Sequence, residues 1–330
     1  LIDNTNTSIK MKILISGGAG FLGSNLCERL LNEGHEVTAL DNLITGNESN
    51  IESLKQNPNF KFENLNILEV KKLEDREFDR VYHMASPASP NKFSKKSYLA
   101  LPFETMQANT NGTSALAEFA QTKGAKFLFA STSEIYGDPL EHPQKETYRG
   151  NVSTTGIRSV YDEAKRFGET ITSAFIRYQN LDGRIIRIFN TYGPKMDPDD
   201  GRAVIEFVKK ALKNEPIPIF GDGTQTRSFC YVDDLIDGII KAMETDGTKG
   251  EIFNIGNPVE FTISDLAQIV KRVTGSTSEI TYTEALPEDD PKRRKPDIEK
   301  ARKILKWEPQ VKLEDGLKRL VQHLNDSQKH

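Results

Sequence analysis

The sequence predicts an α/β fold built on a doubly wound parallel sheet, with a second, smaller α/β domain. Three observations predict this fold class. Short apolar runs alternate with longer helical patterns, as in a parallel sheet that is covered by helices. A glycine-rich turn follows the first apolar run directly. The chain of 330 residues is also long enough for two domains that share a cleft.

The first unit of the predicted sheet is a strand, a helix and a strand. The run 12–16 (KILIS) predicts the first strand, and the run 36–40 (EVTAL) predicts the second. Between them, leucines recur at helical spacing and Gly34 supplies a C-terminal stop. Further strands are predicted at 80–85, 126–131 and 183–189, and a long helix at 159–175.

The sequence pattern changes after about residue 195. Prolines cluster at positions 194, 198, 216 and 218, and shorter helices and strands follow, such as 231–243 and 251–256. We interpret these short elements as the smaller domain. The prediction is a dinucleotide-binding domain over 11–195 that carries the catalytic residues. Residues 196–330 form mainly a substrate-binding domain, from which some segments return to the first.

The composition is typical of a soluble globular protein, with 36% hydrophobic and 28% charged residues. A net charge of −4 gives no reason to expect a nucleic-acid partner. No apolar stretch approaches the roughly 20 residues that cross a bilayer, and the first ten residues are polar, unlike a signal peptide. We therefore expect no membrane contact from this chain.

The two cysteines, Cys27 and Cys230, have no spacing typical of a disulfide framework or a zinc site. We expect no metal site and a reducing compartment, which favours the cytoplasm. The chain begins at Leu1 rather than Met. An upstream anchor is therefore an open alternative, and it would place the protein in the Golgi lumen.

The glycine-rich turn predicts a dinucleotide site. Its glycines stand after the first strand and at the start of the helix, where the turn must be tight and backbone must approach a pyrophosphate closely. The helix N-terminus then offers free N–H donors to the phosphate. This is the Rossmann arrangement. The residues expected at the cofactor are Gly17, Gly20, Phe21, Leu22 and Gly23.

The end of the second predicted strand indicates which dinucleotide binds. Asp41 stands near the offset at which an acid binds the adenosine ribose hydroxyls, with Asn42 beside it. A carboxylate there repels the extra phosphate of NADP, so NAD is the expected cofactor. The alternative is that Asp41 is only a turn residue. After the third strand, Asn66 and Ile67 are expected to meet the adenine ring.

Tyr161 and Lys165 stand four residues apart, on one face of the predicted helix 159–175. A nearby ammonium lowers the pKa of a phenol and makes a base for a sugar hydroxyl. The same spacing is also common on solvated helices. At the end of the fourth run, Thr132 and Glu134 bring a hydroxyl and a carboxylate to the edge of the sheet where such folds bind ligands.

The motifs GGAGFLG (17–23), STSEIYG (131–137) and YDEAK (161–165) resemble those of the extended short-chain dehydrogenase/reductase family of nucleotide-sugar enzymes. The likeness runs from about Met11 to about Leu324. Five further segments carry it: HMASPASP (83–90), RIFNTYGP (187–194), DDGRAVIEF (199–207), GDGTQTRSFCYVDDL (221–235) and DDPKRRKPDI (289–298).

The resemblance implies a role for each matching residue. Thr132, Tyr161 and Lys165 would serve hydride transfer with NAD, and Glu134 would serve carbon 5 of the sugar. Independently of the family, guanidinium groups are the expected partners of a diphosphate or a carboxylate. In the run 292–295, with Glu288, Asp289 and Asp290 before it, a solvated loop with one ligand-facing arginine is expected. The residues implied at the substrate are Ser133, Asn190, Arg202, Arg227 and Arg294.

Within this family the resemblance implies decarboxylation of UDP-glucuronate to UDP-xylose through a transient 4-keto sugar. Ser133 argues against a dTDP-glucose 4,6-dehydratase, since the dehydrating members have an aspartate there as the acid. A UDP-glucuronate 4-epimerase is the main alternative. A catalytically silent dinucleotide-binding sensor is the alternative outside enzymes, and the intact Thr132, Tyr161 and Lys165 count against it.

The sequence departs from the family pattern at a few positions. The segment 91–109 is longer than its counterpart, and Gln107 and Ala108 stand where decarboxylases have a lysine-containing motif. Asn66 replaces a usual aspartate and Ala164 a frequent glycine. Gln107 and Ala108 put the substrate contacts in question. By family analogy, the helices 105–122 and 159–177 imply a homodimer.

Overall fold

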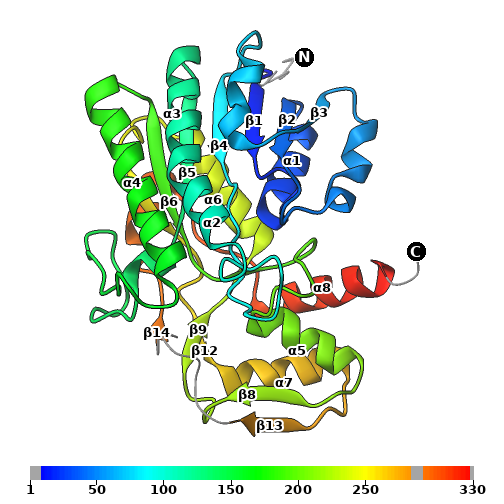
Figure 1. Ribbon diagram of the computed structural model, residues 1–330. Helices are drawn as coiled ribbons and strands as arrows, with labels where there is room; N and C mark the ends of the chain where they lie inside the picture. Colours follow the sequence, from blue (N-terminus) through cyan, green and yellow to red (C-terminus); the bar gives the residue numbers. More distant parts are fainter. Residues whose placement is uncertain (1–8, 284–292, 328–330) are drawn as a thin grey trace, which may run out of the picture.

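The computed structural model describes residues 9–283 and 293–327. Its centre is a seven-stranded parallel sheet in the order β11-β6-β5-β4-β1-β2-β3 (Figure 1). The strands are β1 (Lys12–Ser16), β2 (Glu36–Asp41), β3 (Phe60–Asn64), β4 (Arg80–His83), β5 (Lys126–Thr132), β6 (Gly183–Ile188) and β11 (Ile252–Ile255). The strands predicted at 12–16, 36–40, 80–85, 126–131 and 183–189 are confirmed, to within one or two residues at their ends.

Helices cover both faces of this sheet, so the doubly wound fold class is confirmed (Figure 1). One face carries α1 (Phe21–Asn32) and α6 (Val232–Glu244). The other carries α2 (Pro102–Asn109), α3 (Asn111–Lys123) and α4 (Ser159–Gln179). The strands are apolar along nearly their whole length because both faces are buried. Short helical turns lie between them: η1 (Glu48–Asn50), η2 (Glu52–Gln56), η3 (Ile67–Leu73) and η4 (Ser133–Tyr136).

A smaller group of elements lies below the large sheet in Figure 1. It contains the helices α5 (Ala203–Leu212) and α7 (Ile263–Thr274), packed against each other. Three short sheets accompany them: β8 (Ile217–Phe220) with β13 (Ile280–Thr283), β7 (Thr191–Tyr192) with β10 (Cys230–Tyr231), and β9 (Thr226–Ser228) between β12 (Glu260–Thr262) and β14 (Arg293–Arg294). The π-helical turn η5 (Ala301–Leu305) and α8 (Leu313–Ser327) complete the chain.

Two elements that we interpreted from sequence as part of the smaller domain belong to the large sheet. Strand β11 pairs in parallel with β6, and α6 packs across β5, β6 and β11. The physical reason is burial: the carboxyl half of α6 and the strand β11 are both almost wholly apolar and need two covered faces. The sequence predicts that some segments after residue 195 return to the first domain, but sequence order alone does not show that these two elements do so.

Among residues 9–283 and 293–327, no helix is long and apolar enough to cross a membrane. Cys27 and Cys230 are buried free thiols on α1 and β10. They therefore behave as small apolar side chains of the core.

Trp307 fastens the C-terminal segment to the large sheet. Its side chain is 1% exposed, and its indole Nε1 donates a hydrogen bond of 2.9 Å to the Asp234 carbonyl on α6. The Asp234 carboxylate in turn accepts from the Val311 amide at 2.9 Å. These contacts hold the segment before α8 against the start of α6.

We expect Trp307→Ala to lower the free energy of unfolding by about 3–5 kcal/mol, because it leaves a large cavity and removes the indole hydrogen bond to the Asp234 carbonyl. Urea denaturation measures this change. Leu140→Ala is the control, since Leu140 is 82% exposed, and it should alter stability by less than about 0.5 kcal/mol. An equal effect of the two substitutions would contradict this view of the core.

Candidate functional site

The glycine turn between β1 and α1 is shaped by close backbone contacts. Gly17 has φ +73°, which a side chain rarely tolerates, and its amide donates to the Leu40 carbonyl at 2.8 Å. A Cβ atom on Gly23 would lie 2.0 Å from the Gly17 carbonyl oxygen. Within the described chain, no side chain caps the start of α1 and no acid stands in its first turn. The first amides of α1 therefore stay available to an anionic phosphate, as a dinucleotide requires.

Asp41 ends β2 next to this turn and is only 7% exposed. Its Oδ2 accepts from the Ala19 amide at 3.0 Å and its Oδ1 from the Leu43 amide at 2.8 Å. Burial raises the pKa of Asp41, and the two backbone hydrogen bonds oppose that rise. Each carboxylate oxygen has further acceptor capacity, so the group fits a pair of ribose hydroxyls.

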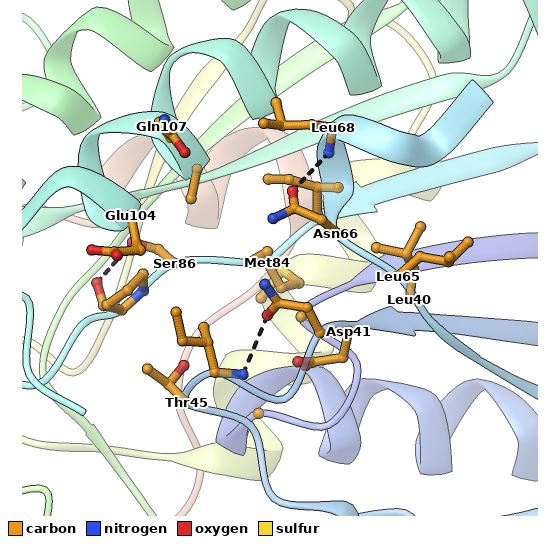
Figure 2. A pocket seen from close by; sticks show the side chains of 18 residues that line it. Leu40, Asp41, Thr45, Leu65, Asn66, Leu68, Met84, Ser86, Glu104 and Gln107 are labelled. Atoms are coloured by element: carbon orange, nitrogen blue, oxygen red, sulfur yellow. Dashed lines mark hydrogen bonds between the residues drawn. The ribbon is translucent and has the colours of Figure 1, made fainter. Parts of the chain in front are cut away.

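A cavity opens beside Asp41 at the carboxyl ends of the strands (Figure 2). Asn66 caps the start of η3, and its Oδ1 accepts from the Leu68 amide at 3.0 Å, which leaves its side-chain NH₂ group for a ligand. Phe21, Leu22 and Gly23 lie in the first turn of α1 and are not among the described residues that line the cavity. The predicted residues that do line it are Gly17, Gly20, Asp41, Asn42, Asn66 and Ile67.

The same cavity contains the positions at which the sequence departs from the family pattern. Glu104, Gln107 and Ala108 line it from α2, opposite Asp41 (Figure 2). Gln107 and Ala108 thus line the dinucleotide cavity. Their departure from the family pattern therefore concerns the cofactor side of the site more than the sugar.

Tyr161, Lys165 and Thr132 come together where α4 crosses the end of β5. The Tyr161 hydroxyl is hydrogen-bonded to the Thr132 side chain. The Lys165 Nζ donates to the Ala130 carbonyl at 2.7 Å and lies 5.8 Å from the centre of the Tyr161 ring. All three side chains are buried, so a solvated helix face is excluded as the reason for the spacing of Tyr161 and Lys165.

The acid–base balance of this group differs from the sequence prediction. We expected Lys165 to lower the pKa of Tyr161, and the structure shows that this pKa is raised. Burial raises it most, the Glu134 charge adds to the rise, and Arg202 opposes it. Burial also lowers the pKa of Lys165 to about 7, against the attraction of Glu169. Desolvation, which disfavours both charged forms, outweighs the attraction between ammonium and phenolate that the spacing suggested.

Glu134 lies beside Tyr161 in an arginine clamp. Its Oε2 accepts from Arg158 Nη2 at 2.6 Å, and its Oε1 lies 3.6 Å from Arg294 Nη1. The side chains of Arg158 and Arg294 are themselves only 13% and 6% exposed. Burial opposes ionisation of Glu134, but Arg158 and Arg294 together lower its pKa below the usual range. Glu134 is therefore a carboxylate at neutral pH.

The remaining substrate candidates lie on several different elements. Arg202 directly precedes α5 as its N-cap residue, and its charge lowers the pKa of both Tyr161 and Glu134. Arg227 on β9 is paired in register with Arg294 on β14. Ser133 is buried between Thr132 and Glu134, and Asn190 joins β6 to β7. Residues 284–292, which include Glu288, Asp289, Asp290 and Lys292, lie outside the described residues.

Sequence reasoning missed three residues of this site. Arg158 pairs with Glu134. Its position three residues before Tyr161 was the one sequence feature that could have placed it near the catalytic group. Asp162, next to Tyr161, is hydrogen-bonded to Glu134. The Tyr98 ring stacks on the Tyr161 ring, with 4.9 Å between centroids and 12° between planes. No pattern pointed to Tyr98, because it comes from the long segment 91–101 with no regular spacing.

Several characterised proteins resemble this chain in sequence and in fold. UDP-glucuronic acid decarboxylase 3 of Arabidopsis thaliana is 48% identical over 308 residues, which cover 93% of this chain and 87% of that protein. UDP-glucuronic acid decarboxylase 1 of Danio rerio is 43% identical and covers 97% of this chain and 74% of that protein. The solved structure of UDP-glucuronic acid 4-epimerase from Bacillus cereus, in complex with UDP-glucuronic acid and NAD, has a TM-score of 0.84 at 32% identity and covers 96% of this chain and 100% of that chain.

The family follows from these likenesses and from a direct match. Residues 13–256 match the family described as "NAD dependent epimerase/dehydratase family". That span contains the glycine turn, Asp41, and the group of Thr132, Tyr161 and Lys165. The resemblance expected from the motifs is therefore confirmed, and the chain belongs to the NAD dependent epimerase/dehydratase family.

Proposed function

We propose that this protein is an NAD-dependent decarboxylase that converts UDP-glucuronate to UDP-xylose and carbon dioxide. The observation that carries the proposal is the buried Glu134 carboxylate, clamped by Arg158 and Arg294 beside the Tyr161 hydroxyl. The high identity to UDP-glucuronic acid decarboxylases over 93–97% of the chain supports the same reaction.

The residues at the dinucleotide cavity fit NAD. Asp41 would hold the adenosine ribose, the uncapped start of α1 would hold the pyrophosphate, and Asn66 and Ile67 would meet the adenine. NAD, when bound, supplies the hydride acceptor for carbon 4 of the sugar and returns the hydride at the end of the cycle. The protein therefore performs no net oxidation.

Tyr161 removes the proton from the hydroxyl at carbon 4. Thr132, hydrogen-bonded to Tyr161, holds that hydroxyl in line with the phenol oxygen. In its ammonium form, Lys165 stabilises the Tyr161 phenolate, since its Nζ lies 5.8 Å from the centre of that ring. The raised pKa keeps the Tyr161 phenol protonated at neutral pH, so its own proton must pass to solvent before the phenolate accepts the proton of the sugar hydroxyl. The phenolate is then a strong base, because a weaker acid has a stronger conjugate base.

The ketone at carbon 4 is beta to the sugar carboxylate, so carbon dioxide leaves readily. Ser133 has no acid group that would expel a hydroxyl from carbon 6, which disfavours dehydration. We assign the diphosphate, uridine and sugar contacts to side chains at the smaller group of elements. These are Ser133, Asn190, Arg202, Arg227 and Arg294.

Epimerisation of UDP-glucuronate at carbon 4 is the second candidate function. It would use the same first step, and the solved 4-epimerase that resembles this chain binds the same nucleotide sugar. The clamp on Glu134 favours decarboxylation, because rotation of a ketone needs no group at carbon 5.

We also infer a homodimer through α2, α3 and α4. Helices α2 and α4 pack against each other. They expose the aromatic rings of Phe103 (71%), Phe167 (54%) and Tyr178 (81%). Exposed aromatic rings on neighbouring helices are typical of a protein interface.

With UDP-glucuronate and NAD, we expect release of carbon dioxide and formation of UDP-xylose, without stoichiometric NADH. Product analysis by mass and NMR tests this. An isomer of the substrate would identify the 4-epimerase instead. Cofactor binding without turnover of any nucleotide sugar would identify a sensor.

Tyr161→Phe should lower kcat about 100- to 10,000-fold, the usual loss of a general base, and leave the affinity for NAD unchanged. The ring, and hence its stacking on Tyr98, is kept. Tyr282→Phe is the matched control, because Tyr282 lies on β13 and is 59% exposed, and it should behave as the wild type. Near-normal activity of Tyr161→Phe would remove Tyr161 from the reaction.

NAD should bind at least about 100-fold more tightly than NADP, because the Asp41 carboxylate repels the extra phosphate at short range. Calorimetric titration of both dinucleotides measures the ratio. Asp41→Asn should narrow it, since the amide keeps the size of the side chain and loses the charge. Equal affinities in the wild type would remove Asp41 from the ribose site.

A further inference from the structure

Three buried polar atoms around Glu134 lack a hydrogen-bond partner. Within the described chain five such side-chain atoms occur, and three of them are Tyr98 Oη, Asp162 Oδ1 and Arg294 Nε. Each belongs to a residue no more than 6% exposed. Buried unsatisfied groups are costly, so their gathering at one place indicates a polar ligand or a working proton site.

Asp162 is the most informative of the three. It stands in the first turn of α4, where the helix dipole favours a carboxylate. The structure opposes that preference. Burial raises the pKa of Asp162 most, and the neighbouring Glu134 charge raises it further, against the attraction of Arg158 and Arg294. Asp162 is therefore the protonated member of a hydrogen-bonded pair whose other member, Glu134, is ionised.

The proposed reaction needs a proton donor for carbon 5, and the pair of Asp162 and Glu134 can supply it. After carbon dioxide leaves, carbon 5 must gain a proton. Glu134 is the residue assigned to carbon 5, but between Arg158 and Arg294 it holds no proton of its own at neutral pH. A proton must reach it from a neighbour, and the Asp162 carboxyl is hydrogen-bonded to it.

We propose that Asp162 and Glu134 share one proton and deliver it to carbon 5 of the sugar after decarboxylation. The inference rests on the proposed function. Asp162 acts through Glu134 and is thus a positioning residue that supplies the proton, while Glu134 is the group at the substrate.

The step balances in atoms and charge. The electron pair of the broken carbon–carbon bond remains in an enolate over carbon 5, carbon 4 and the carbon 4 oxygen. The proton moves from Asp162 to Glu134 and from Glu134 to carbon 5, where that electron pair forms the new C–H bond and the ketone is restored. Asp162 is left as a carboxylate and takes one proton from solvent, so one solvent proton is consumed for each carbon dioxide released.

The groups around the pair determine its titration. Arg158 precedes α4 and Arg294 comes from β14, and both favour the single negative charge of the pair. Two negative charges side by side are disfavoured, so the second proton is lost only at alkaline pH. The titratable or charged neighbours are Tyr98, Arg158, Tyr161, Arg202 and Arg294.

Asp162→Asn tests the proposal, because the amide still donates a hydrogen bond to Glu134 but transfers no proton. We expect kcat for UDP-xylose to fall by about 100-fold, the lower range for a lost proton donor, with KM and the affinity for NAD within about twofold. A larger share of turnovers should end in released UDP-4-ketopentose and NADH, measured by mass and absorbance. Glu163→Gln, the same carboxyl-to-amide replacement at the next residue of α4, which is partly exposed, should leave the rate and product ratio unchanged.

The pH dependence separates a proton supply from a structural role. In the wild type, the yield of UDP-xylose relative to released ketopentose should fall as pH rises through the raised pKa of Asp162, since the proton is then lost. Asp162→Asn should show no such fall. If that variant does not fold, the pH dependence of the ratio of UDP-xylose to ketopentose in the wild type still tests whether Asp162 supplies the proton.

Two results would overturn the proposal that Asp162 and Glu134 deliver the proton. One is a product ratio of the wild type that does not change with pH. The other is a folded Asp162→Asn variant with the wild-type rate and pH profile. Both presuppose that the wild type makes UDP-xylose. If it makes none, the proposed function fails first, and the two failures are thereby distinguished.

Discussion

The parallel register of the large sheet is the constraint on which the site depends. Strands β1, β2, β4 and β5 run side by side in one direction, so their carboxyl ends meet at one edge. Gly17, Asp41 and Thr132 each follow or end such a strand. Residues more than a hundred positions apart in the chain are thus brought to one edge by the parallel pairing of the strands.

The buried negative charge of Glu134 at this edge is tolerated because arginine side chains pair with it. An isolated carboxylate as deeply buried as Glu134 would lose several kcal/mol of hydration, and it would take up a proton instead. The 2.6 Å contact with Arg158 and the nearby Arg294 offset that loss. The adjacent Asp162 has no such pairing of its own and stays neutral. Two carboxyl groups of the same kind therefore reach opposite protonation states within one cluster, by position alone.

Much of the large sheet could be predicted from sequence, because buried parallel strands appear as short apolar runs between helical patterns. The turn at Gly17 and the pairing of Tyr161 with Lys165 follow from local spacing. The return of β11 to the sheet and the stacking of Tyr98 on Tyr161 do not, since both depend on contacts distant in sequence. The order of the pKa values at Tyr161 and Lys165 was also beyond the sequence, because burial determines it and burial is a property of the fold.

Arg294 on β14 has a consequence for synthesis of the protein. Residues up to 195 supply six of the seven strands of the large sheet, with Asp41, Thr132 and Tyr161 among them. The seventh strand, β11, and the second arginine of the clamp on Glu134 are made much later. On the ribosome, the nascent chain forms its dinucleotide half well before Glu134 has both of its counter-charges. A growing chain therefore acquires its cofactor pocket first and its complete acid–base centre only near the end of translation.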